Sequence, residues 1–155
     1  METRMSIKQK ILVIDDDPQI RDTLEAVLSA EGYQVEVAER GKDAVKKSEE
    51  KWFNVALIDI RLPDMSGTQL LTELREGNPK MRKIIMTGFP TLSNAIEAVN
   101  KQADAYLTKP FKVPKMLETI KEQLVLQEGE KTFSNTKVEE YVKTRAKDFL
   151  DQKKR

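Results

Sequence analysis

The segment ILVIDDDP, residues 11–18, joins four consecutive apolar residues to three acids and a proline. A short run that is apolar throughout is typical of a strand buried on both faces, as in a parallel sheet covered by helices. Pro18 is favourable at the first position of a helix, because the amide hydrogen that proline lacks has no helical partner there. The segment therefore predicts a buried strand that delivers three carboxylates to the start of a helix.

The same alternation of short apolar runs and helically spaced apolar residues continues along the chain. Further strands are expected at residues 33–38, 55–58, 84–86 and 105–107. The intervening helical patterns include Ile20, Leu24, Val27 and Leu28 after the first strand and Met116, Leu117, Ile120 and Leu124 after the last. Five strands alternating with five helices predict an α/β fold, a doubly wound five-stranded parallel sheet with helices on both faces.

The composition excludes several classes of function. The 155 residues include no Cys and no His, so Ser-His-Asp triads, thiolate catalysis and His- or Cys-ligated metals are ruled out. Any metal must bind oxygen ligands, which favours Mg²⁺, Ca²⁺ or Mn²⁺. A net charge of +1 gives no basic field, so direct nucleic-acid binding is not expected. No apolar run is long enough for a membrane span or a signal peptide, and we expect a cytoplasmic protein.

Polar residues that suit phosphoryl chemistry follow several of the expected strands. The first strand runs into Asp15, Asp16 and Asp17, the third ends at Asp59, the fourth at Thr87 and the fifth at Lys109. Open α/β sheets place their sites at these strand ends. Clustered carboxylates repel one another unless a cation binds, and Mg²⁺ accepts both such ligands and phosphate oxygens. Asp59 stands apart from the other acids and is the best candidate for a nucleophile that forms an acyl phosphate.

Four motifs in register resemble the receiver domain of two-component response regulators. They are ILVIDDDP, LIDIRLPDMSG, IIMTG and DAYLTKPF, and the intervals from Asp15 to Asp59, Thr87 and Lys109 in turn are 44, 28 and 22 positions. The resemblance covers residues 8–127 and implies a flavodoxin-like strand order of 2-1-3-4-5. It suggests a stand-alone, chemotaxis-regulator-like receiver with a C-terminal helical extension.

The resemblance implies a role for each of the matching residues. Asp59 would be the phosphoacceptor, with Asp15, Asp16, Asp59 and the backbone carbonyl of Arg61 holding Mg²⁺. Thr87 would be the switch hydroxyl and Lys109 the lysine that pairs with the phosphoryl group. Tyr106 would be the aromatic switch, although an aromatic residue in a strand can equally be static packing.

Two further positions in this resemblance concern the lifetime of the phosphorylated form. Arg61 and Phe89 lie two residues after the phosphoacceptor and two after the switch hydroxyl, where family members influence the approach of the hydrolytic water. Both are bulky and neither orients a water through a carboxylate or amide, so slow dephosphorylation is expected. Packing of Phe89 beside Pro90 is the alternative.

The chain departs from the family pattern in one turn. A glycine usually precedes the Ala103-Asp104 pair, whereas this chain has Gln102. The resemblance also implies a cis peptide bond between Lys109 and Pro110.

Two other functions share parts of this pattern. A haloacid-dehalogenase-like phosphatase would use Asp15 as its nucleophile, but it also needs a cap insertion and a late acid pair that are absent here. A flavodoxin-like cofactor binder would place phosphate after the first strand, where three acids would repel it. We therefore expect a phosphorylation-gated switch that is not an enzyme on other substrates, with a sensor histidine kinase or phosphotransfer protein as its donor.

The residues after the receiver form a separate region in this interpretation. A boundary is expected near Gly129, dividing a receiver domain at residues 8–127 from a linker and amphipathic helix at 128–155. The apolar positions of this helix are Val138, Tyr141, Val142, Ala146, Phe149 and Leu150. We expect it to dock on the receiver or on a second copy, near the face of the fourth and fifth helices. A segment that stays disordered until a partner binds, or a tail that only solubilises the domain, is the alternative. Output would run through protein contacts, and homodimers could use the face of the fourth helix, fifth strand and fifth helix, or the C-terminal helix.

Overall fold

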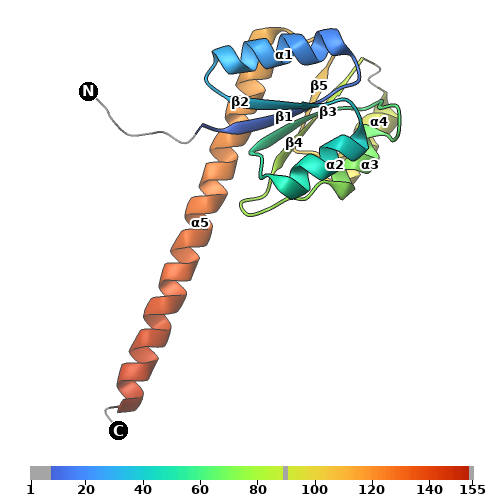
Figure 1. The fold of residues 1–155 in the computed structure, drawn as a ribbon. Coiled ribbons are helices and arrows are strands. Elements are labelled where there is room, and N and C mark those ends of the chain that lie inside the picture. Colours follow the sequence, from blue (N-terminus) through green and yellow to red (C-terminus); the bar gives the residue numbers. More distant parts are fainter. Residues whose placement is uncertain (1–7, 89–90, 154–155) are drawn as a thin grey trace, which may run out of the picture.

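The computed structural model describes residues 8–88 and 91–153, although the side chains of residues 131–139 and 152–153 lie outside the described part. Its five strands are β1 (Lys10–Ile14), β2 (Gln34–Ala38), β3 (Val55–Asp59), β4 (Arg82–Thr87) and β5 (Ala105–Thr108). All neighbours pair in parallel, in the order β2-β1-β3-β4-β5 (Figure 1). The predicted sheet and its strand order are confirmed.

Five helices connect or follow the strands. They are α1 (Pro18–Ala30), α2 (Gly41–Glu50), α3 (Gly67–Glu73), α4 (Leu92–Asn100) and α5 (Val113–Lys153). Three of the N-termini are capped by side chains that accept an amide hydrogen bond, namely Asp17 for α1, Ser66 for α3 and Thr91 for α4. These caps satisfy helical amides that have no backbone partner, and they set where the helices begin.

The sheet separates two apolar layers, and successive residues of the central strands contribute to them alternately. Ile11 and Val13 of β1 pack with Leu24 and Leu28 of α1 and with Met116, Ile120 and Leu124 of α5. The neighbouring Leu12 and Ile14 face the other layer, to which α2, α3 and α4 contribute Ala44, Leu70, Leu71 and Ala98. Figure 1 shows the same division, with α1 and α5 on one face and α2 to α4 on the other. Burial on both faces explains the runs of consecutive apolar residues in the central strands, at 11–14, 55–58 and 84–86.

The C-terminal extension is helical as expected, but the linker expected near Gly129 is not a loop. Helix α5 runs without interruption from Val113 to Lys153 and projects well beyond the sheet (Figure 1). Gly129 lies within it, and its φ is not among the positive values found at Gly32 and Gly77. Extending a formed helix adds one hydrogen bond per residue without a new nucleus, so a single glycine does not end it.

Side chains anchor α5 to the sheet where it leaves the domain. The Gln127 amide donates to the backbone carbonyls of Asn54 at 2.9 Å and Lys80 at 3.0 Å, and its oxygen accepts from the Asn54 side chain at 2.9 Å. Three residues later, Glu130 pairs with Arg82 at 2.8 Å. Beyond this anchor, all the side chains described between residues 140 and 151 are exposed. The expected docking of this segment on its own receiver is therefore wrong.

Among the described residues, none of the helices combines the length and the apolar character that crossing a membrane requires.

Candidate functional site

Three carboxylates meet at the carboxyl ends of β1 and β3. One oxygen each from Asp15, Asp16 and Asp59 can be chosen so that all three lie within 4.8 Å of one another. Asp15 and Asp59 are buried, whereas Asp16 is exposed. The sheet register brings Ile14 opposite Ile58, so the acids that follow these two residues meet at the same edge. A cluster of carboxylate oxygens with one open side fits a hard divalent cation that keeps several waters.

Lys109 reaches this cluster from the loop after β5. Its Nζ donates to Asp15 at 2.7 Å and to Asp59 at 3.3 Å. The backbone amide of Lys109 donates to the carbonyl of Thr87 at 2.6 Å, which ties the β5–α5 loop to the end of β4. The expected convergence of Asp15, Asp59 and Lys109 is therefore present.

The electrostatics of the site differ between its members. Burial raises the pKa of the Asp59 carboxyl, and the negative charges of Asp15 and Asp16 raise it further against the opposing effect of Lys109. Burial alone would lower the pKa of the Lys109 ammonium, but the hydrogen bond and charge of Asp15, together with Asp59, raise it. The site therefore favours the cationic form of Lys109 and disfavours the ionised form of Asp59, whose charge a bound cation would compensate.

The loop after β3 is held tightly around Asp59. Gly67, at the start of α3, approaches the Asp59 backbone so closely that a Cβ there would collide with the Asp59 carbonyl oxygen. In the same loop, the Asp64 carboxylate accepts the backbone amides of Gly41 at 2.9 Å and Lys42 at 3.0 Å. Although desolvation acts in the opposite direction, these amides hold the pKa of Asp64 below its usual value. Asp64 therefore fastens the Asp59 loop to α2.

Two residues that support the site could not be identified from the sequence pattern alone. Arg21 donates from its guanidinium to the Asp15 carbonyl at 2.8 Å, and Asp64 forms the link to α2 just described. Arg21 looks like an ordinary solvated residue of α1 in the sequence. The only available signal for Asp64 is its place in the matching LIDIRLPDMSG motif.

Thr87 and Tyr106 lie on the paired strands β4 and β5, where Tyr106 is two residues before Thr108, the register partner of Thr87. Thr87 is fully buried at the end of β4. The Tyr106 ring packs against the layer formed by α2 to α4, and its hydroxyl oxygen is buried. Burial raises the pKa of the Tyr106 phenol, and the Thr87 hydroxyl acts in the opposite direction. The two side chains are thus close enough for a change at Thr87 to reach Tyr106.

Four further positions singled out in the sequence lie around the site or outside the described residues. Arg61 lies just after β3 and forms an isolated backbone bridge with Ser66. Phe89 lies outside the described residues. The Lys109-Pro110 bond is cis, as expected. Gln102 adopts a left-handed φ of 69° in the turn before β5, which explains why a glycine usually stands there.

Helix α4 presents an apolar surface beside Tyr106. Leu92, Ile96 and Val99 are 78%, 51% and 73% exposed, and Ala98 is the buried apolar residue of this helix. A hydrogen bond of 2.9 Å from the buried Thr68 hydroxyl to Glu97 connects α4 to α3. Exposed apolar side chains of this kind are expected of a helix that binds a partner.

Comparison with known proteins identifies a family for this chain. The model of the response regulator receiver domain matches residues 11–121. The transcriptional regulatory protein ZraR of Klebsiella oxytoca is 39% identical over 114 residues, which are 74% of this chain and 26% of that protein. The chain thus spans about a quarter of the length of this relative.

Solved structures agree with the family model. A CheY-like receiver domain protein from Methanospirillum hungatei superimposes with a TM-score of 0.77 at 44% identity, covering 80% of this chain and 99% of that one. A response regulator from Burkholderia pseudomallei, solved with a phosphorylated aspartic acid and a calcium ion, gives a TM-score of 0.69 at 30% identity, with coverage of 83% and 75%.

Proposed function

The chain belongs to the response regulator receiver domain family of two-component systems, and from that premise we propose that Asp59 is its phosphoacceptor. The carrying observation is the grouping of Asp15, Asp16, Asp59 and Lys109 at one edge of the sheet. A phosphodonor contributes the phosphoryl group, and no residue of this chain other than Asp59 need be modified.

The acid cluster fits Mg²⁺ as the cofactor. Asp15, Asp16 and Asp59 supply carboxylate oxygens, and the backbone carbonyl of Arg61 is the further ligand we propose. Mg²⁺ neutralises charge on the carboxylates and on the phosphoryl oxygens when it is bound. The raised pKa of Asp59 supports the proposal, because a cation would relieve the repulsion that causes part of it.

The residues of the chain position the reaction. An Asp59 carboxylate oxygen forms a bond to phosphorus while the bond from phosphorus to the donor breaks, and the electron pair leaves with the donor. Lys109 pairs with the phosphoryl oxygens, and Thr87 donates its hydroxyl to one of them. The product is an acyl phosphate on Asp59, and the chain catalyses only its own phosphorylation and dephosphorylation.

The donor we propose is a sensor histidine kinase or a phosphotransfer protein. A groove of about 560 Å³ lies beside Lys109. Its lining comes from α1 and from the β5–α5 connection, and includes Ile20, Leu24, Pro110 and Phe111. An apolar groove beside the phosphoacceptor suits a protein donor better than a free metabolite, because it offers area for a helix to pack.

Output is proposed to run from Thr87 through Tyr106 to α4. A hydroxyl drawn toward the phosphoryl group would alter the surroundings of the Tyr106 phenol, which lies beside Thr87. The exposed α4 residues would then bind a protein partner or a second copy through the face of α4, β5 and α5. We assign the receiver domain to residues 8–127 and a C-terminal extension to residues 128–155.

One experiment separates this function from the phosphatase alternative with Asp15 as nucleophile. In the structure the Asp15 carboxylate already accepts Lys109 Nζ and the Asp17 amide, at 2.7 and 3.0 Å, which is not the arrangement of a free nucleophile. Incubation with acetyl phosphate and Mg²⁺ should give one acyl phosphate per chain, with no sustained turnover of a generic phosphomonoester. Continuous release of phosphate from the phosphomonoester would contradict the proposal.

A further inference from the structure

The two halves of α5 carry apolar side chains on the same side of the helix. Ile120 in the first half is buried against the sheet, whereas Val142 and Phe149 in the second half are 58% and 57% exposed. At about 100° per residue, Val142 is turned by only about 40° from Ile120, and Phe149 by about 20°. The side of the helix that packs on the sheet therefore continues into water beyond it.

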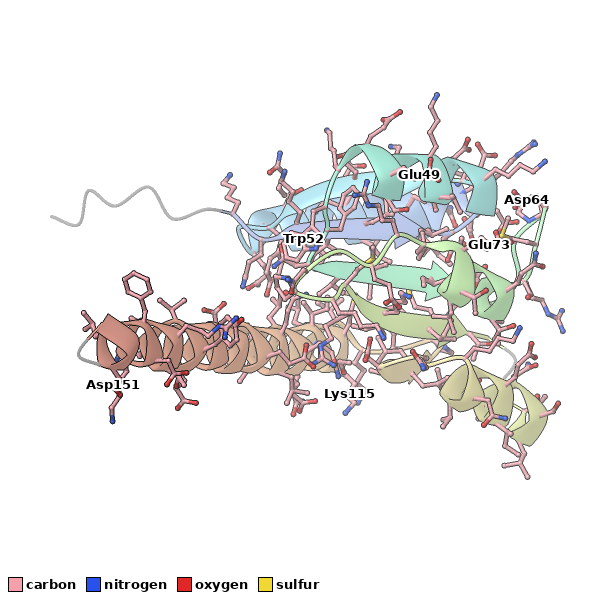
Figure 2. All side chains as sticks on the ribbon, turned by 90° about the horizontal axis from the view of Figure 1, so that it is seen from below. Glu49, Trp52, Asp64, Glu73, Lys115 and Asp151 are labelled. Carbon is pink, nitrogen blue, oxygen red and sulfur yellow. The ribbon has the colours of Figure 1, made fainter. Side chains whose placement is uncertain are left out.

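Residues on the outer side of α5 show the same alignment of its two halves (Figure 2). Lys115 and Asp151 are 36 residues apart (151 − 115), which is a whole number of turns at 3.6 residues per turn. Both lie on the side of α5 that is turned away from the sheet (Figure 2). The helix therefore keeps one orientation from end to end, and its apolar stripe is on the receiver side throughout.

The large apolar side chains described in this extension are exposed. Tyr141 and Leu150 are 63% and 58% exposed and flank the stripe formed by Val142 and Phe149. An unsupported helix of this length is only marginally stable in water, and an apolar stripe is usually covered. A partner that covers the stripe would stabilise the segment.

The position of the receiver disfavours a parallel pair of helices through this stripe. The receiver packs on the stripe side of α5, against the N-terminal half of the helix. The N-terminal half of a parallel partner helix would therefore enter the space that this receiver occupies. An antiparallel partner avoids this conflict, because its own receiver lies beyond the C-terminal end of the first helix.

We propose that the extension, from Tyr141 to Leu150, binds the same segment of a second copy in an antiparallel helix pair. The exposed large residues are symmetric about the midpoint between Arg145 and Ala146. Val142 of one copy then lies opposite Phe149 of the other, twice over. This self-complementary spacing is what a two-fold pair of identical helices requires.

Charge complementarity favours the same register. In this arrangement Arg145 of one copy lies within one helical turn of Asp148 of the other, on the same flank of the pair. The contact occurs twice by symmetry. The Arg145 guanidinium also lies 5.7 Å from the centre of the Tyr141 ring of its own helix, which keeps its charge at the edge of the stripe.

The length of the extension permits this pairing. From the anchor at Glu130 to the midpoint is about 15 residues, or about 23 Å of helix. The two receivers would therefore be held about 46 Å apart, measured between the Glu130 residues, and would not collide. Asp59 lies at the carboxyl ends of the strands, whereas the extension leaves the domain at their amino ends. The helix pair should therefore not depend on phosphorylation.

Charge exchange between two variants tests the proposal directly. Sedimentation equilibrium on the full chain, from about 1 μM to about 1 mM, should show a monomer–dimer equilibrium. Arg145→Glu alone and Asp148→Lys alone should each weaken the dimer by about tenfold or more, because each places like charges together twice. An equimolar mixture of the two should recover it, since both contacts are then attractive. Lys147→Glu, with the same charge change on the outer side of the helix, is the matched control and should have no effect.

Disulfide trapping defines the direction of the pair. The chain contains no cysteine, so Val142→Cys and Phe149→Cys introduce single thiols on different chains. Oxidation of the mixture should give mainly the disulfide between unlike chains. A preference for disulfides between like chains, a dimer indifferent to Arg145→Glu and Asp148→Lys, or a monomer at all concentrations would overturn the proposal. The same dimer in Asp59→Asn protein would separate this result from the fate of the proposed phosphoacceptor.

Discussion

Lys109 pairs with Asp15 at 2.7 Å and only secondarily with Asp59, at 3.3 Å. The lysine proposed to meet the phosphoryl group is therefore held by an acid proposed to bind the metal. This arrangement leaves Asp59 the less compensated of the two buried carboxylates, in agreement with the raised pKa of Asp59. Binding of a cation at Asp15 and Asp16 would compete with Lys109 for Asp15 and release its ammonium toward Asp59.

Replacement of Asp59 by Asn should stabilise the protein in metal-free buffer at neutral pH. The folded-state pKa of Asp59 lies above its unfolded value, so ionisation costs stability above the folded pKa. That cost declines as the pH falls toward the unfolded pKa, and below it the variant and the parent should be equal in this respect. We expect a gain of about 1 kcal/mol at neutral pH, measured by urea unfolding across pH.

Asp15→Asn is the contrasting variant. It loses the 2.7 Å ion pair with Lys109, so it should be no more stable than the parent protein. Equal stabilisation by both substitutions would mean that Lys109 does not discriminate between the two acids.

Asp16→Asn should weaken Mg²⁺ binding by about tenfold or more with little change in stability. Asp16 is exposed, and its carboxylate lies within the cluster of oxygens proposed to bind the metal. Isothermal titration with MgCl₂ measures the effect. Unchanged affinity in Asp16→Asn would rule out this residue as a ligand.

Asp17→Asn provides the matched control for Mg²⁺ binding. The Asp17 carboxylate accepts the Gln19 amide at 2.9 Å and caps α1, so its role is structural. Asparagine is also a good N-cap, and both stability and Mg²⁺ affinity should be nearly those of the parent protein.

Phosphorylated protein should lose its label slowly. Arg61 and Phe89, two residues after Asp59 and Thr87, carry no carboxylate or amide that could orient the attacking water. Phe89→Asn should therefore shorten the lifetime of the acyl phosphate, followed by loss of label after removal of the donor. Decay within seconds in the parent protein, or equal decay in both, would be inconsistent with this role.

Gln102→Gly should raise the free energy of unfolding by about 1 kcal/mol. Gln102 has a φ of 69°, a left-handed conformation that costs little for glycine and about this much for other residues. The substitution removes one exposed hydrogen bond, from Lys80 Nζ to the Gln102 side chain, which contributes little in comparison. Thermal unfolding compares it with Gln102→Ala, which keeps the strain and should not stabilise.

The strands of the sheet and the convergence of residues at their carboxyl ends could be predicted from short sequence patterns. The segment at residues 11–14 and its counterparts in β3 and β4 are apolar throughout because both faces of the sheet are covered. The site could be predicted from Asp15, Asp59, Thr87 and Lys109 because parallel strands end at one edge.

Features set by tertiary context could not be predicted in this way. Arg21 binds a carbonyl of Asp15, and backbone acceptors leave no signature in side-chain spacing. The expectation of a break at Gly129 overestimated the tendency of a single glycine to end a helix. Gln127 and Glu130, on either side of Gly129, anchor the helix to the domain. The apolar pattern of one helix also does not specify which surface, if any, covers Tyr141 and Val142.

Intact-mass spectrometry after incubation with acetyl phosphate and Mg²⁺ measures whether Asp59 alone accepts the phosphoryl group. The parent protein should gain the mass of one phosphoryl group and lose it on treatment with hydroxylamine, as expected for an acyl phosphate. Asp59→Asn should show no addition, whereas the cap variant Asp17→Asn should be labelled like the parent. A phosphoryl group still present on Asp59→Asn would mean that another residue accepts it.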